Sequence, residues 1–418
     1  MSDRGKVLKV AVRAFEPFER ALEKIWASYC EETHCDLQLE IVPMELGPLH
    51  NEILDKNGLK KGDWDIAHIN TDWIAEAWRS DAVENLQPYL QKNPPEDYPK
   101  GWSVSLLNMQ KIDDAVVGLP FHDGPECLMY RKDLFENSDE QEKYRKEFDK
   151  ELKPPRTWQD FMDIAHFFHR PESNLFGAVF AAYPDGHNTV FDFCLQLWTR
   201  GGELTDGNDT IVIDTPAAKE GLKFYRAMLR DDSAVHPGCA DFDSVKAGLA
   251  FARGEVAMMV NWFGFASLCE VHEQSKTKGK VDITTIPHAP AGRDVSLNVY
   301  WLYAIGSGSL HKQTAYDFIK YAVNPQNDKL LTLEGGIGCR LSTWSDPEVN
   351  RIIPYYHRLE ELHEKARELP CRSDWDKITK VIDQVVLDVA NTNLPINEIL
   401  KTGQQKINQL QNDDRSLL

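Results

Sequence analysis

The first part of the chain alternates between two patterns of hydrophobic residues. Short apolar runs, typical of strands, are followed by segments in which apolar residues recur on one helical face. The predicted strands here are Val7–Val12, Leu37–Val42 and Ile66–Ile69, and the predicted helices are 16–32 and Trp73–Trp78. Strands that alternate with helices indicate a mainly parallel sheet covered by helices on both faces.

The same alternation starts again near residue 120, and strands return near residue 281. The later predicted strands are Cys127–Tyr130, Val256–Val260, Val281–Ile286 and Leu302–Ile305, and later helices are predicted from Thr157 and at 189–200, 216–231 and 241–253. The charged segment 136–156 is expected to be a surface connection. One sheet built from residues 1–120 and 281–310, and a second built from the middle, would explain the pattern. The chain would then cross several times between two lobes, as hinged proteins do.

Ligands of α/β sheets bind beyond the carboxyl ends of the strands. In this sequence, the segments at those ends are Arg13–Phe18, Met44–Pro48 and Asn70–Trp73. We therefore expect ligand contacts from these three loops.

The composition narrows the choice of partners. The net charge of −19 repels the phosphate backbone, so nucleic acid is not an expected partner. No run of about 18 apolar residues occurs, so no segment is expected to span a membrane. Some of the eleven Trp residues must lie in a core, and others are candidates for flat surfaces on which a ligand stacks.

The start of the chain and its cysteines leave the compartment open. Residues 1–6 lead directly into a predicted strand, without the apolar region of a secretory signal. This suits a cytosolic protein, and equally an exported domain whose signal was replaced by a start Met. The eight Cys residues contain no CxxC pair, and we expect most of them to be small buried apolar residues. One or two disulfides would be compatible with export.

Six groups of short motifs occur in a fixed order between residues 64 and 340. They are WDIAHINTDWI at 64–74, VGLPF at 117–121 with YRKDLF at 130–135, PPRTWQDF at 154–161, FARGEVAMMVNW at 251–262, AYDFIKYAVNP at 315–325 and GGIGCR at 335–340. In this order they resemble the family 1 extracellular solute-binding proteins of bacterial carbohydrate ABC transporters, including the maltodextrin-binding type. The resemblance covers nearly the whole chain. It departs from the family at Gly338-Cys339, where the family has Pro-Val, and before Trp262, where the family's Gly-Pro is missing.

The resemblance implies an α/β, two-lobed periplasmic-binding-protein fold of type II. Each lobe is expected to be a mainly parallel sheet flanked by helices. The expected lobes are 1–121 with 279–313, and 122–278 with 314–418, and the expected hinges lie near 119–124, 278–286 and 310–316. A monomer of this kind captures a sugar or oligosaccharide between closing lobes and delivers it to the permease subunits of an ABC importer. It is periplasmic or lipid-anchored outside the cytoplasm, has no cofactor or bound metal, and is not an enzyme.

The ligand contacts follow from the motif positions and from the end of the first strand. An acid suits sugar binding because a carboxylate accepts hydrogen bonds from two adjacent hydroxyls, and an aromatic ring covers the apolar face of the sugar. The predicted contacts are Arg13, Glu16, Asp72, Trp73, His122, Asp123, Asn188, Trp262, Phe263, Trp301, Arg340 and Trp375. Among them, Trp262 and Trp375 are expected to stack on the ligand.

Each of these residues also has a structural interpretation. Asp72 and Asn188 can cap helices, and the segment around His122 and Asp123 can form a hinge turn. The aromatic residues can belong to the core, and Arg340 can form a structural salt bridge.

Two other functions are open. A glycoside-active enzyme could use Asp72 with Asp123 or Glu16, although the sequence holds no GxxxxGK[ST], HExxH or GxSxG motif. A protein that binds a non-sugar solute such as a polyamine would be lined by acids and aromatic residues. Arg13 and Arg340 in the same site would disfavour a polycation.

Overall fold

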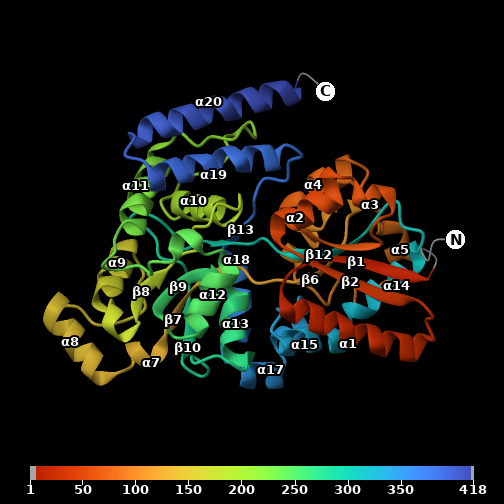
Figure 1. Cartoon of the computed structure of the whole chain (residues 1–418), viewed down its shortest axis with the longest axis horizontal. Coiled ribbons are helices and arrows are strands. Elements are labelled where there is room, and N and C mark those ends of the chain that lie inside the picture. The colour runs from red at the N-terminus through yellow and green to blue at the C-terminus, as the bar shows by residue number, and fades with distance from the viewer. Residues whose placement is uncertain (1–5, 416–418) are drawn as a thin grey trace. The chain divides into compact units, whose positions relative to one another are not determined.

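The computed structural model describes residues 6–415, which form two compact units (Figure 1). Unit 1 comprises the chain up to Gly124 together with Val299–Leu359 and Cys371–Ser373. Unit 2 comprises Pro125–Asn298, Glu360–Pro370 and the chain from Asp374 on. The chain therefore passes between the units several times, as the interrupted strand pattern predicts.

Unit 1 contains a five-stranded mixed sheet. Its strand order is β2 (Gln38–Met44), β1 (Val7–Arg13), β3 (Ile66–Asn70), β12 (Trp301–Ile305) and β6 (Leu119–His122). The strand β1 is parallel to β2 and β3, whereas β12 is antiparallel to β3 and β6. The prediction of a mainly parallel sheet is thus wrong for β12. A fully buried strand has the same apolar pattern in either direction, so the sequence does not reveal how it runs.

The direction of the strands brings five chain segments to one edge of this sheet. The strands β1, β2, β3 and β6 end at this edge, and β12 begins there because it runs the opposite way. The residues at this edge are Arg13, Met44, Asn70, His122 and Trp301. Most of the predicted ligand contacts of unit 1 lie at these strand ends or in the segments that follow them.

The helices of unit 1 bury apolar faces against the sheet and one another. In α1 (Glu16–Thr33), a helix predicted at 16–32, the apolar face of Phe18, Leu22, Ile25 and Tyr29 is buried. The remaining elements of unit 1 are α2 (Leu46–His50), η2 (Asn51–Asp55), α3 (Gly58–Lys61), η3 (Thr71–Trp73), α4 (Ile74–Arg79), α5 (Gln87–Lys92), α6 (Val104–Met109), β4 (Lys111–Ile112), β5 (Ala115–Val116), α14 (Lys312–Ala322), α15 (Pro325–Glu334), α16 (Leu341–Trp344), α17 (Pro347–Ile352) and η6 (Tyr356–Arg358).

Unit 2 contains a four-stranded sheet that is also mixed. Its order is β10 (Val281–Thr284), β7 (Glu126–Arg131), β9 (Val256–Trp262) and β8 (Phe176–Val179). The strand β7 is antiparallel to both β10 and β9, and only β8 and β9 are parallel. One edge of this sheet therefore holds the start of β7 and the ends of β8, β9 and β10.

Two helices of unit 2 begin with a predicted ligand contact: α10 (Asn188–Trp198) begins with Asn188, and α19 (Trp375–Asn391) begins with Trp375. The helix α10 is almost completely buried, and it packs on α19 and on α11 (Pro216–Leu229). The remaining elements are α7 (Lys132–Phe135), α8 (Ser138–Phe148), α9 (Trp158–Phe167), η4 (Pro171–Ser173), η5 (Cys239–Asp241), α12 (Ser244–Ala252), α13 (Phe263–Val271), β11 (Ser296–Leu297), α18 (Leu359–Lys365), β13 (Ala366–Arg367) and α20 (Ile396–Arg415).

The helix predicted from Thr157 is present, whereas the segment before it differs from the prediction. Thr157 is the cap of α9, because its Oγ1 accepts a hydrogen bond of 3.1 Å from the Asp160 N–H. The charged segment 136–156, expected as a surface connection, instead contains the helix α8. Its cap is Asn137, which accepts hydrogen bonds from the N–H groups of Asp139 and Glu140. A helix with so few apolar residues gives little amphipathic signal, so the hydrophobic pattern missed it.

The boundaries of the two units differ from the expected lobes. The strand β10 was expected in the first lobe, but it pairs with β7 in unit 2. The helices α14 and α15 were expected in the second lobe, but they pack on α1 in unit 1, where Trp26 meets Phe318 at 4.8 Å between ring centroids. A sequence pattern identifies a strand or helix without identifying the sheet against which it packs.

Five of the eight cysteines are buried, as expected for small apolar residues: Cys127, Cys194, Cys239, Cys269 and Cys339. In the part of the chain that the structure describes, no helix combines the length and the apolar character needed to cross a bilayer.

Candidate ligand-binding residues

The candidate site of unit 1 is the sheet edge at which β3 and β6 end and β12 begins. In the strand register, Trp301 lies opposite both Asn70 and His122. Asp72 follows β3 within η3 and is only 8% exposed. The cap of η3 is Asn70, whose side chain accepts a hydrogen bond from the Asp72 N–H.

Two tryptophans stand beside Asp72 at this edge. The rings of Trp73 and Trp301 meet edge to face at 5.7 Å between centroids. Trp73 is buried and also contacts the ring of His50, whose Nε2 lies 2.9 Å from a carboxylate oxygen of Glu76. Trp301 remains partly exposed. The partly exposed ring is therefore the one of the two that offers a surface to a ligand.

His122 is a neutral group fixed within unit 1. Its Nδ1 accepts a hydrogen bond of 2.9 Å from the Ile337 N–H, which places any ring proton on Nε2. Burial lowers the pKa of His122 to about 4, against the opposing charge of Asp123. Asp123 is 2% exposed, and its own N–H donates to the Ile337 carbonyl at 2.9 Å. The loop after β6 is thus anchored to the 335–340 segment.

Arg13 and Glu16 have partners within unit 1. Arg13 ends β1, and its guanidinium pairs with Glu45 at 2.5 Å. Glu16 is exposed and pairs with Arg20 at 2.7 Å along α1. An exposed acid that already has a cationic partner is poorly suited to hold a ligand hydroxyl, which leaves Glu16 as the weaker candidate.

Arg340 is held by contacts that fit a structural role. It is 1% exposed, its guanidinium lies 3.9 Å from the ring centroid of Trp102, and it donates to the Glu96 carbonyl at 2.9 Å. The backbone of its segment is bound by Asp328, which accepts hydrogen bonds from the N–H groups of Cys339 and Arg340 and from the hydroxyl of Thr343. Arg340 therefore acts as an anchor of unit 1 in this structure.

The candidate site of unit 2 is the edge where β7 begins and β9 ends. Glu126 and Trp262 face each other across these two antiparallel strands. Trp262 is partly exposed, and its ring packs edge to face on Phe191 of α10 at 5.4 Å. Glu126 is 5% exposed, and its Oε2 has no hydrogen-bond partner among the described residues. An aromatic ring and a buried carboxyl thus lie side by side at this edge.

Further carboxyls surround the start of α10. Asp192 accepts a hydrogen bond of 2.7 Å from the hydroxyl of Tyr225, and Asp383 of α19 accepts one from Thr189. Burial raises the pKa of Asp192 to about 7, and the charge of Asp185 adds to this shift. Burial, and secondly the charge of Asp192, raise the pKa of Glu126 well above the usual range. These acids therefore favour their neutral forms more than surface acids do.

The other predicted contacts of unit 2 are more enclosed. Asn188 donates to Asp185 at 2.6 Å, and Asp185 caps α10 by accepting hydrogen bonds from two N–H groups. Phe263 is fully buried, so it belongs to the core of unit 2. Trp375 is 1% exposed, and its Nε1 has no hydrogen-bond partner within the described range. A ligand could stack on Trp375 only if a neighbouring group moved, whereas Trp262 has an exposed surface.

Glu126 is not among the ligand contacts that the sequence predicts. It directly follows Gly124-Pro125, where the backbone of Gly124 has φ of 132°, a conformation that favours glycine. A strand that begins with a carboxylate just after such a turn was the available signal. The motif order drew attention to the earlier residues of this loop instead.

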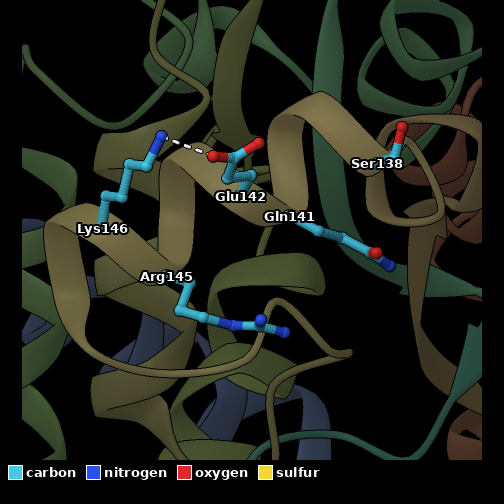
Figure 2. A pocket seen from close by; sticks show the side chains of 5 residues that line it. All are labelled: Ser138, Gln141, Glu142, Arg145 and Lys146. Carbon is cyan, nitrogen blue, oxygen red and sulfur yellow. Dashed lines mark ion pairs between the residues drawn. The ribbon is translucent and has the colours of Figure 1, made fainter.

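A surface hollow of about 470 Å³ lies elsewhere, on one side of α8 (Figure 2). Its lining residues are Ser138, Gln141, Glu142, Arg145 and Lys146. All five come from one helix, most are exposed, and Glu142 is already paired with Lys146 at 2.5 Å. The hollow is a groove between surface side chains rather than a built site. Among the described residues, no group of three or more His, Cys, Asp or Glu side chains is placed to hold a metal ion.

Two α/β units joined by several crossings, with aromatic rings and buried carboxyls at one edge of each sheet, form the architecture of a solute-binding protein. The chain belongs to the bacterial extracellular solute-binding protein family, whose sequence model matches residues 16–329. It is 22% identical over 365 residues to a Deinococcus radiodurans protein named "Probable ABC transporter-binding protein", covering 85% of this chain and 81% of that protein.

Solved structures show the same two-lobed fold. Maltose-bound MalE3 of T. maritima has a TM-score of 0.85 at 22% identity, covering 97% of this chain and 99% of that one. An ABC transporter solute-binding protein of Agrobacterium radiobacter K84 in complex with ribitol has a TM-score of 0.85 at 21% identity, covering 98% and 100%. At these identities the likeness shows the fold, and it confirms the predicted two-lobed architecture.

Proposed function

We propose that this protein captures a neutral polyhydroxylated solute, a sugar or sugar alcohol, outside the cytoplasm and delivers it to the permease of an ABC importer. One observation supports this most directly. In each unit a partly exposed tryptophan lies beside a buried acid at the same kind of sheet edge: Trp301 near Asp72, and Trp262 opposite Glu126.

This pairing suits the two kinds of surface on a sugar or polyol. The ring covers a face of C–H groups, because burying apolar surface is favourable. The carboxyls bind the hydroxyls at the rim, and site polar groups left unpaired by a wrong solute would be costly. The similar structures that hold maltose and ribitol support the same class of solute.

The enzyme alternative has less support. Glu16, one of the acids that it would use, is exposed and paired with Arg20. The family and the similar structures are solute-binding proteins. We therefore expect the bound solute to be released unchanged, and an oligosaccharide that gained new reducing ends during incubation with the protein would contradict this.

The polyamine alternative gains one argument from the structure. Neither Arg13 nor Arg340 offers an unpaired cation, because Glu45 pairs with the first and the second is held by Trp102 and the Glu96 carbonyl. The acids around α10 would also attract a cation. The raised pKa values of Glu126 and Asp192 favour the neutral solute, since a neutral carboxyl both donates and accepts hydrogen bonds with a hydroxyl.

A thermal-shift screen tests the proposal. The panel should hold hexoses, disaccharides, maltodextrins and sugar alcohols, with linear diamines as the competing class. A solute present at 100 times its Kd stabilises the folded protein by about 2.7 kcal/mol, which raises the melting temperature measurably. The proposal is wrong if no polyhydroxylated compound raises it, or if only the diamines do.

A further inference from the structure

Glu126 is an unusual residue for the interior of unit 2. Its backbone is fixed as the first residue of β7, and its carbonyl accepts a hydrogen bond of 2.5 Å from the hydroxyl of Ser296. Its side chain is buried, yet its Oε2 has no hydrogen-bond partner among the residues that the structure describes. Buried polar atoms are almost always paired, so an exception calls for an explanation.

The surroundings of Glu126 do not supply a structural reason for a carboxyl there. Across the strand pair stands Trp262, and the acid that acts electrostatically on Glu126 is Asp192, which bears the same sign of charge. Asp192 is already engaged by the hydroxyl of Tyr225. Burying an acid near a second acid destabilises the folded chain, and an apolar residue or a glutamine would avoid the repulsion.

Another buried glutamate of unit 2 shows how a structural carboxyl is held. Glu270 of α13 is 3% exposed, and it accepts a hydrogen bond of 2.7 Å from the N–H of Gly279. It thereby fixes the turn that follows α13. Glu126 and Glu270 are buried to a similar degree in the same unit. Oε2 of Glu270 accepts a hydrogen bond from the protein, whereas Oε2 of Glu126 accepts none from the described residues.

We infer that Glu126 is a ligand contact of unit 2: its carboxyl binds one or two hydroxyls of the solute while the ring of Trp262 covers the adjoining C–H face. This inference rests on the proposed function and adds a residue and a chemistry to it. The solute supplies the hydrogen-bond partner that Oε2 lacks among the described residues. The preferred group at this place is a hydroxyl on a carbon next to an apolar face, as in a sugar or a sugar alcohol.

The test compares two matched pairs of variants in the full chain. Glu126→Leu removes the carboxyl, Glu126→Gln keeps its shape, and Glu270→Leu and Glu270→Gln are the controls. The ligand is the sugar or sugar alcohol that gives the largest thermal shift with the parent protein. Two quantities are measured for each variant: the melting temperature without ligand, and the Kd by calorimetry.

The two glutamates should respond in opposite ways. Glu126→Leu should melt no lower than the parent but bind at least roughly tenfold more weakly, and Glu126→Gln should bind about threefold to tenfold more weakly. Glu270→Leu should melt lower than the parent and bind within about twofold of it. This crossed pattern separates a residue kept for the ligand from one kept for the fold.

Three results overturn the inference, and only the third of them also overturns the proposed function. Glu126→Gln binding within about twofold of the parent overturns the contact, and this variant decides the question if Glu126→Leu does not fold. A melting temperature of Glu126→Leu as low as that of Glu270→Leu assigns Glu126 a structural role. A parent stabilised by 1,4-diaminobutane and by no sugar or sugar alcohol overturns both the proposed function and the hydroxyl contact.

Discussion

Asp328 in unit 1 and Glu126 in unit 2 are buried carboxyls under different conditions, and the partly exposed Asp192 acts electrostatically on Glu126. Asp328 is 2% exposed and accepts hydrogen bonds from two backbone N–H groups and the Thr343 hydroxyl, at 2.6 to 3.2 Å. These bonds limit the effect of burial, which raises the pKa of Asp328 to about 6. Asp192 has one hydroxyl partner, and Glu126 has none at Oε2 within the described chain.

The difference separates two uses of a buried acid. The donors around Asp328 come from the 338–343 segment, so the carboxyl shapes the backbone that leads to Arg340. Gly338 fits this arrangement, because a Cβ there would lie 2.2 Å from an Asp328 oxygen. Near Glu126 the protein keeps a carboxyl without such donors. A satisfied acid stabilises its own unit, and an unsatisfied one is available to a solute.

The largest effect is expected from removing Asp328. Asp328→Ala leaves two buried N–H groups and a hydroxyl without an acceptor, and each lost partner costs about 1–3 kcal/mol. We expect the free energy of unfolding to fall by at least about 3 kcal/mol, measured by urea denaturation. The affinity of the folded fraction for its solute should change little.

Asp346 provides the matched control for Asp328. It also accepts hydrogen bonds from two backbone N–H groups in unit 1, those of Glu348 and Val349, but it caps a helix at the surface. Removal of such a cap costs typically about 1 kcal/mol. If Asp346→Ala and Asp328→Ala lowered the free energy of unfolding equally, the buried hydrogen bonds of Asp328 would stabilise the protein no more than a surface helix cap does.

The next largest effect concerns the exposed ring of unit 2. If Trp262 covers about 80 Å² of apolar solute surface, the contact contributes roughly 2 kcal/mol at about 25 cal/mol per Å². Trp262→Ala should then weaken binding about 30-fold in calorimetry. Trp262→Phe keeps an aromatic plane and should lose much less.

Stability has to be followed in the same experiment, because Trp262 also packs on Phe191. Melting curves without ligand show whether each variant is folded. A folded Trp262→Ala protein that bound within about twofold of the parent would transfer the stacking role to Trp301, the partly exposed ring of unit 1.

A pH profile tests the effect of burial on the carboxyl of Asp192. Its pKa in the folded chain is about 7, above the ordinary value of 3.8, so the unfolded chain releases its proton first as the pH rises. The folded chain therefore loses stability between about pH 4 and pH 7, and the full loss is present above pH 7. Asp192→Asn should raise the free energy of unfolding by about 1–2 kcal/mol at pH 8 and leave it unchanged below pH 4.

The exposed Asp214 is a suitable control, since Asp214→Asn should leave the pH profile as it is in the parent. An Asp192→Asn protein that is less stable than the parent at pH 8 would show that the bond to Tyr225 outweighs the burial of the charge. Asp192 would then stabilise its own unit, as Asp328 does.

The sequence predicted the two-unit architecture and most strands well. Periodicity located β1, β3, β9 and β12 within one or two residues, because buried strands carry strong apolar runs. Strand direction and the unit to which β10 and α14 belong were not predictable, since they depend on contacts between residues far apart in the chain.

Only some residues of the candidate site were predicted from the sequence. A strand end pointed to Asp72 and a motif position pointed to Trp301, and the structure places both residues at one sheet edge. Phe263 and Arg340 matched motif positions, but their burial and contacts within their own units are structural. Glu126 is not among the predicted contacts, because the lack of a hydrogen-bond partner at Oε2 among the described residues is a property of the folded chain. The sequence shows only that a carboxylate follows Gly124-Pro125.

The smallest effect is expected for Asp72, and it concerns selectivity more than affinity. Asp72→Asn replaces one acceptor with a donor while it keeps the size of the side chain. Solutes that differ in the orientation of one hydroxyl should therefore change their order of affinity. We expect the Kd of the preferred solute to rise less than about tenfold, and the ratio of Kd values for two epimers to change more than threefold.

Calorimetry with both epimers measures this, with Asp81→Asn as a control because Asp81 is exposed and lies beyond the end of α4. An unchanged ratio in a folded Asp72→Asn protein would make Asp72 a structural acid like Asp328. The acid at the sheet edge of unit 1 would then be held by the fold, as Asp328 is, and it would differ in role from Glu126 at the sheet edge of unit 2.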